Sequence, residues 1–166
     1  MKKLILVCAM LPGLMYADVC ALVTGGYGMG NTFYGPTNCG EGSVDSVSVM
    51  GPLGVQGTNI KTMTVNGPLH VVDANIGAMF VNGPIQAENS NIGDISVSGN
   101  VTLNATRAGN IIVKGAPTFG NYKVKLDDGT TVKSVTFEAG EGVVVESSGS
   151  SVTGKVMGGQ LQAQVQ

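Results

Sequence analysis

Among the 166 residues of this chain, three carboxylates are the best candidates for catalytic residues, because of their spacing. Glu41, Asp73 and Glu88 fall near one column of a sixteen-residue repeat, so they could stack along one edge of the fold. Carboxylates gathered in a groove act as general acids and bases on glycosidic bonds, often with calcium or a basic residue beside them. No Arg or Lys column faces these three. Because acidic residues at turns usually serve solubility, we expect no catalytic residue and no enzyme activity.

Sulfur and imidazole chemistry is limited to three cysteines and one histidine, His70. A zinc site needs several closely spaced Cys or His ligands, and this sequence has no such cluster. We expect no metal and no other cofactor. If the chain is cut after Ala17, Cys20 and Cys39 remain, and two thiols in an exported protein favour one disulfide, with unpaired thiols as the alternative.

The first seventeen residues have the features of a secretory signal. Two lysines precede the apolar run LILVCAML, and Ala17 offers a small residue at a cleavage position. The run is far shorter than the roughly 20 residues that cross a bilayer, so we expect no transmembrane segment after cleavage. Cys8 and Cys20 each follow a valine, unlike the acylated cysteine of a bacterial lipoprotein. The signal predicts an exported protein in the periplasm, at the outer surface or outside the cell.

Composition excludes further classes of function. The 26 glycines, 12% charged residues and formal charge of −2 leave no basic face, so we expect no nucleic-acid partner. The glycines between Gly25 and Gly30 could suggest a phosphate-binding turn. No helix pattern follows them, however, and such a turn needs a helix N-terminus. Residues 18–32 are therefore interpreted as a glycine-rich cap segment.

A sixteen-residue repeat organises the middle of the chain. Six blocks follow one another from residue 33 without a gap, among them VNGPLHVVDANIGAMF from 65. The third position is always glycine, which predicts a positive φ or a corner too tight for a Cβ. Proline follows in four blocks and makes one corner with the glycine. The turn glycines are Gly35, Gly51, Gly67, Gly83, Gly99 and Gly115.

Apolar residues recur at fixed positions of the block, in pairs spaced by two as in a strand. We expect the core columns to be Val49, Val65, Val81, Val97 and Val113, with Ile60, Ile76 and Ile92. The pattern predicts three short strands per block and an all-β fold, a single-stranded parallel β-helix of about six coils. A helix would need spacings of three and four, and a β-sandwich would not hold one register over six blocks. The handedness stays open.

The predicted organisation has four parts. The signal covers 1–17, the cap 18–32, the β-helix repeats 33–119, and a C-terminal hairpin with terminal strands covers 120–166. The hairpin is predicted because alternating apolar residues flank Asp128-Gly129. The sixteen-residue register weakens after Phe119, which is therefore taken as the end of the repeat region.

The ends of a solenoid are where its function is expected. A solenoid exposes open strand edges, which proteins usually block with charges, proline or a cap. The final segment QLQAQVQ has none of these, and its apolar residues Leu161, Ala163 and Val165 form the candidate association strand. We expect an exported, non-enzymatic structural protein that self-associates through its ends into a filament or an envelope layer.

Coils of Val and Gly with a Gly-Pro corner also give the repeat region a loose similarity to bactofilins, polymer-forming β-helix proteins. The resemblance covers residues 33–119 only and implies a β-helix that polymerises. Bactofilins are typically cytoplasmic, whereas this chain carries a signal sequence.

The alternative function is a surface binding module. A flat solenoid face could recognise a glycan or another envelope protein. Regular Thr-x-Thr arrays would indicate ice binding, but only Thr62 and Thr64 fit that pattern. Asn59, Asn75 and Asn91 recur just before the Ile column, and we interpret them as a structural amide ladder and not as a ligand site.

Overall fold

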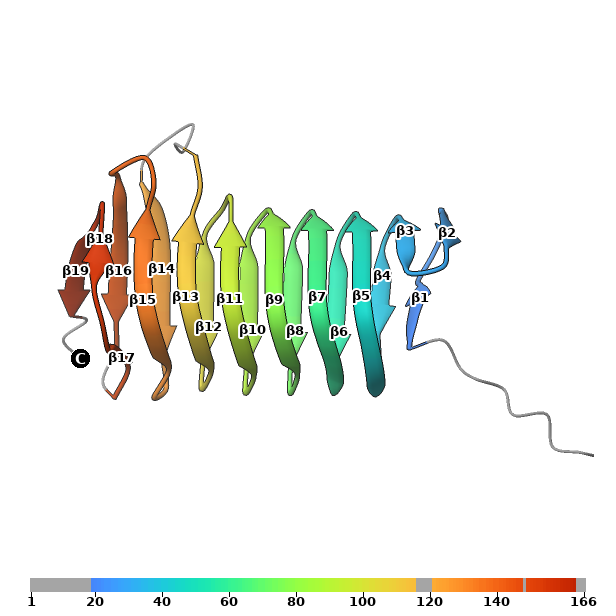
Figure 1. The fold of residues 1–166 in the computed structure, drawn as a ribbon, viewed down its shortest axis with the longest axis horizontal. Coiled ribbons are helices and arrows are strands. Elements are labelled where there is room, and N and C mark those ends of the chain that lie inside the picture. Colours follow the sequence, from blue (N-terminus) through green and yellow to red (C-terminus); the bar gives the residue numbers. More distant parts are fainter. Residues whose placement is uncertain (1–18, 116–120, 148, 164–166) are drawn as a thin grey trace, which may run out of the picture.

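The computed structural model describes residues 19–115, 121–147 and 149–163, and every regular element in these ranges is a β-strand. The strands stack into a β-solenoid of about eight turns (Figure 1). This confirms the predicted all-β solenoid, with more turns than the six that the repeat indicated. The additional turns come from the segments on either side of the regular blocks. The predicted signal, Phe119 and Val165 lie outside the described residues.

Each regular turn contributes one strand to each of two sheets. The short-strand sheet has the spatial order β1 (Cys20–Leu22), β4 (Thr37–Cys39), β6 (Leu53–Gln56), β8 (Leu69–Val72), β10 (Ile85–Glu88), β12 (Val101–Asn104), β14 (Tyr122–Asp127), β16 (Gly142–Glu146) and β19 (Gln160–Ala163). The long-strand sheet has the order β2 (Tyr27–Met29), β3 (Thr32–Tyr34), β5 (Gly42–Met50), β7 (Thr58–Asn66), β9 (Asn75–Asn82), β11 (Asn91–Val97), β13 (Arg107–Val113), β15 (Thr131–Phe137) and β17 (Ser151–Val152), with β18 (Val156–Met157) also pairing with β15.

The long strands replace two of the three short strands predicted for each coil. In β7 the buried residues Ile60 and Met63 enclose two exposed ones, Lys61 and Thr62, where strict alternation would turn one inward. The pairing of β7 with β9 also skips Lys61. The strand therefore bends at this position, and its two halves cover two sides of the core without an intervening loop.

The interior is formed by apolar columns that run along the solenoid axis. Within the regular blocks each column residue pairs with its counterpart sixteen residues away, as Val65 does with Val81. Every predicted core residue is at most 4% exposed: Val49, Val65, Val81, Val97, Val113, Ile60, Ile76 and Ile92. Burial contributes about 1.5–3 kcal/mol for each such side chain, which offsets the entropy lost by a glycine-rich backbone.

The Gly-Pro corner closes each coil on one side. Gly67 has a φ of +153°, and a Cβ there would lie 2.5 Å from the carbonyl oxygen of Gly51 in the preceding coil. Its own N–H donates to the carbonyl oxygen of Asn82 at 3.0 Å. Glycine thus allows the backbones of successive corners to stack in contact. Gly35, Gly51, Gly83 and Gly99 are similarly crowded, whereas Gly115 has φ +73° and open space around it.

The opposite corner follows the short strand and turns through left-handed backbone. Asp73, Asn89, Ala105 and Asp128 occupy it in successive coils, with φ values of 52°, 48°, 46° and 50°. Asn and Asp tolerate this conformation better than other non-glycine residues. Their exposed side chains are therefore explained by the turn itself.

A column of buried hydroxyls lines the same corner and was not predicted. Ser90 Oγ accepts the N–H of Ala74 at 3.1 Å and donates to the carbonyl oxygen of Glu88 at 2.7 Å. Thr106 and Thr130 repeat this arrangement in the next two coils. Each hydroxyl thus satisfies an N–H of the preceding coil and a carbonyl of its own coil, where an unpaired group would cost about 1–3 kcal/mol.

The predicted hairpin is wrong. β14 pairs in parallel with β12 and β16, whereas β15 pairs in parallel with β13, β17 and β18, so the two segments belong to different sheets. Asp128 and Gly129 do reverse the chain with positive φ, but at the left-handed corner of a coil. The turn was predicted correctly and its structural role was not.

The repeat also does not continue without a gap. Ser90 N–H bonds to Thr106 Oγ1 across 16 residues, whereas Thr106 N–H bonds to Thr130 Oγ1 across 24. Val101 consequently pairs with Val124. Val101 and Val124 are 23 residues apart, so seven additional residues lie between β13 and β14. The eighth lies in the Asp128-Gly129 corner before β15, after which the stacking continues.

Candidate functional site

The C-terminal end of the described solenoid is an open strand edge. β19 pairs in parallel with β16, and Leu161 aligns with the fully buried Val144 of the interior column. Leu161 itself is 53% exposed, because no further coil in the described chain stacks on it. Ala163 follows the same inward orientation by alternation, while Gln160 and Gln162 face outward. The predicted association strand therefore presents interior residues at an end of the solenoid.

The two strands β18 and β19 at this end are uncharged, and the exposed Lys155 directly precedes them. Residues 156–163, which form β18 and β19, contain neither a charged residue nor proline. Met157 of β18 is 50% exposed on the outward side of the long-strand sheet. Charges and proline are the devices that usually stop an edge strand from pairing with another chain, so both edges at this end are available for pairing.

At the N-terminal end the first two strands reverse direction. β1 lies antiparallel to β4, and β2 lies antiparallel to β3. Residues 19–40 carry no charge. The rings of Tyr27 and Tyr34 stack with their centroids 4.5 Å apart, and Met29 is 75% exposed. This end thus also consists of uncharged strands with exposed apolar side chains.

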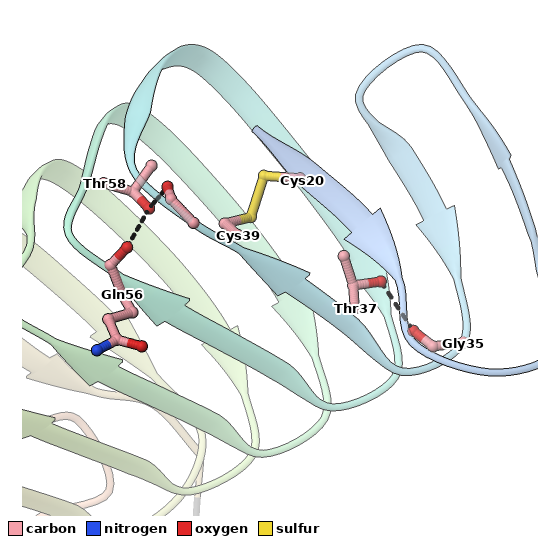
Figure 2. The surroundings of a disulfide bond; sticks show 7 residues. Cys20, Gly35, Thr37, Cys39, Gln56 and Thr58 are labelled. Atoms are coloured by element: carbon pink, nitrogen blue, oxygen red, sulfur yellow. Dashed lines mark hydrogen bonds between the residues drawn. A yellow bond between two sulfur atoms is a disulfide. The ribbon is translucent and has the colours of Figure 1, made fainter. Parts of the chain in front are cut away.

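The predicted disulfide is confirmed. Cys20 and Cys39 are directly opposite each other in the β1–β4 pair and are bonded to each other (Figure 2). Both are buried, so the bond lies inside the coil and attaches the reversed strand β1 to the solenoid. A disulfide is compatible with an oxidising, exported location.

The three candidate carboxylates are not assembled into a catalytic pair. Glu41 and Asp73 lie in the same corner column, but Gly57 stands between them in the intervening coil. Glu88 belongs to the end of the next short strand, and its backbone carbonyl accepts the N–H of Asp73 at 3.1 Å. Within the described ranges, no group of three His, Cys, Asp or Glu side chains could hold a metal ion.

One step of the expected amide ladder is present, and a similar amide pair lies beside it. Asn75 Nδ2 donates to Asn59 Oδ1 at 3.1 Å, and Asn91 is next in the same register. Asn82 Nδ2 donates in the same way to Asn66 Oδ1 on the far half of the long strands. Because these amides bond to one another, their donors and acceptors are partly used by the fold.

One outward face carries an aromatic side chain among small polar ones. Phe80 of β9 is 48% exposed and pairs with Thr64 and Ser96 in the neighbouring strands. A shallow groove of about 360 Å³ runs past it and is lined also by Asn66 and Asn82. Such a surface could contact a flat, hydroxylated ligand.

Charged pairs are few and peripheral. Lys61 Nζ lies 2.6 Å from Asp45 Oδ1, and both side chains are exposed. The hydrogen bond and the charge of Asp45 raise the pKa of Lys61. Exposed pairs of this kind contribute little to stability and are screened by salt.

The described residues contain no helix long and apolar enough to span a membrane. Comparisons with protein-family models, curated proteins and solved structures found no match to this chain, so its assignment is to the β-solenoid architecture and not to a family.

Proposed function

We propose that this protein is an exported, non-enzymatic structural protein that self-associates through the ends of its solenoid. The observation that carries the proposal is β19, an uncharged terminal strand whose interior-column residue Leu161 is half exposed. A strand with unpaired N–H and C=O groups and an apolar side chain is a template for pairing with another chain. The product would be a filament or a layer at the cell envelope.

Two further features support the export and the rigidity of such a unit. The internal disulfide is compatible with an oxidising compartment. The apolar columns and the hydroxyl column run through successive coils. Two copies joined at their ends would therefore share one solenoid axis. The resemblance to bactofilins implies a polymer-forming solenoid, and we extend that role to this chain as part of the proposal.

Placing a charge on the open edge should prevent assembly. We expect the exported wild-type protein to form filaments or layers in negative-stain microscopy and Leu161→Lys to remain monomeric in size-exclusion chromatography. The reason is that an inward-facing ammonium group cannot be buried at a joint without a partner.

The matched control is Gln86→Lys, which adds the same charge to an exposed position of β10 in the middle of the short-strand sheet. It should assemble as the wild type does. A wild-type protein that stays monomeric over a wide concentration range would contradict the proposal, and so would normal assembly of Leu161→Lys.

A second candidate function rests on the Phe80 groove. A surface binding module could hold a glycan there, because sugar faces pack on aromatic rings while Asn side chains bond hydroxyl groups. Phe80, Asn66 and Asn82 supply this combination on one face. Another envelope protein is the alternative partner for the same face.

A glycan array separates this function from self-association. If the protein is a glycan-binding module, a specific signal should fall to background in Phe80→Ala. It should persist in Thr102→Ala, which removes a side chain from the outward side of β12 in the other sheet. No signal on the array, or equal signals from both variants, would contradict glycan binding through this face.

A further inference from the structure

The two ends of the solenoid are the terminal strands of the same two sheets. β1 and β19 are the outermost strands of the short-strand sheet. In the long-strand sheet β2 lies at one end, and β17 and β18, which both pair with β15, lie at the other. A second copy placed end to end could therefore extend both sheets at once. The following inference rests on the proposed self-association and specifies its joint.

The strand directions at the ends determine how the backbones would meet. β18 and β19 run parallel to their neighbours, whereas β1 and β2 are reversed relative to theirs. A β19 edge placed on the β1 edge of another copy would thus make an antiparallel pair, as would β18 on β2. Antiparallel pairs are slightly more stable per residue than parallel ones.

The columns of the solenoid give the register of this joint. Following residue partners through every strand of the short-strand sheet connects Leu161 to Leu22 at the same column, and Ala163 to Cys20. The equivalent path through the long-strand sheet connects Met157 to Met29. Continuing the columns across the joint therefore brings like side chains together.

The match is apolar where the ends are exposed. Met157 and Met29 are 50% and 75% exposed, and Leu161 is 53% exposed while Leu22 is partly buried. In the register just described, the two methionines would shield each other from solvent, and so would the two leucines. The strands at the joint carry no charge, because residues 19–40 and 156–163 contain none. Lys155, which is exposed directly before β18, is the one charged residue of the segment 149–163.

The shapes of the two ends favour joining unlike ends. Figure 1 shows β2 extending beyond β1 at the N-terminal end, and β19 extending beyond β18 at the other. The protruding strand of one end therefore meets the recessed strand of the other end in the same sheet. With the short-strand sheets of both copies kept in line, joining two like ends would oppose two protruding strands and leave a gap in the second sheet.

We infer that the partner of each end is the opposite end of a second copy, with β19 pairing antiparallel to β1 and β18 to β2. The contact is head-to-tail, so the same contact repeats at every joint. An arrangement of this kind grows into an open filament and not into a closed dimer.

Disulfide trapping tests the joint. Met29→Cys and Met157→Cys are made separately, each in a full chain that also carries Cys8→Ser, so that the leader supplies no third thiol. Opposed residues in an antiparallel pair have Cα atoms about 4.5–5.5 Å apart, within the range of a disulfide. Mixing the two variants under mild oxidation should yield a covalent dimer that is lost on reduction, and the double variant should yield a ladder of longer species.

The controls identify which joint forms. Thr64→Cys occupies the same outward column in the middle of the solenoid and should not cross-link with Met157→Cys. Covalent dimers from either single variant alone would show a joint between like ends and overturn the inference. Wild-type filaments without the mixed cross-link would overturn the joint while leaving self-association standing, whereas a monomeric wild type would overturn both.

Discussion

Replacing Gly67 by alanine is expected to lower the free energy of unfolding by roughly 2 to 6 kcal/mol, combining backbone strain with overpacking. The new Cβ would lie 2.5 Å from the carbonyl oxygen of Gly51, and the residue would have to hold φ at +153°. Both problems involve backbone of the adjacent coil, so a side-chain rotation cannot relieve them. Chemical denaturation followed by circular dichroism measures the change.

Gly115→Ala is the matched control for this prediction. Gly115 occupies the corresponding position of a later block, but nothing lies within 4 Å of the Cβ that alanine would add. Its φ of +73° leaves only the cost of left-handed backbone, about 1–2 kcal/mol. Equal losses in the two variants would mean that backbone conformation, and not contact between coils, selects glycine at the corner.

Removing the disulfide should have the second large effect. The bond links residues separated by 19 positions, and a loop of this size is worth about 3 kcal/mol in the chain-entropy model. Reductant should therefore lower the stability of the wild-type protein by about this amount, measured by denaturation with and without dithiothreitol. The variant Cys20→Ala/Cys39→Ala should be less stable from the outset and insensitive to reductant.

The loss should also be largest at one end. Coils of a solenoid contact only their neighbours, so weakening β1 and β4 need not weaken the middle of the molecule. Hydrogen exchange should accelerate most in Cys20–Leu22 and Thr37–Cys39, and much less in β9 and β11. Uniform acceleration along the chain would contradict this picture of local attachment.

The coils themselves could be predicted because their signal is repeated. Val65 and Ile60 recur every sixteen residues in an environment that accepts only apolar side chains, and each repetition reinforces the same register. The bend at Lys61 could not be predicted as part of a continuous strand. Three pairs of apolar positions are compatible with either three short strands or one short and one bent strand.

The later coils were harder to predict for physical reasons. Asp128-Gly129 has the turn chemistry of a hairpin, but the left-handed corner of every coil needs the same backbone conformation. The position of the hydroxyl column is occupied by Thr58, Ala74, Ser90 and Thr106 in successive coils. Because Ala74 interrupts it, no repeated residue type reveals the hydrogen bonds that recur at Ser90, Thr106 and Thr130. The reversal of β1 and β2 depends on tertiary contacts that no local pattern encodes.

For the candidate site, the sequence predicted which residue types lie at the ends of the solenoid but not how they are arranged in space. The absence of charge near Leu161 is visible in the sequence, as is the pair formed by Cys20 and Cys39. The place of Met29 and Met157 in one column is not visible, because it follows from strand pairings that run through the whole solenoid.

The number of stacked coils determines the length of the solenoid. Each coil adds one strand spacing, about 4.8 Å, so about eight turns correspond to a rod of roughly 40 Å. Coil length does not enter this sum, since the long coil between β13 and β15 occupies the same single step as its neighbours. Duplicating a block such as 65–80 would therefore lengthen the unit by one step, and extra residues within a coil would widen it without lengthening it.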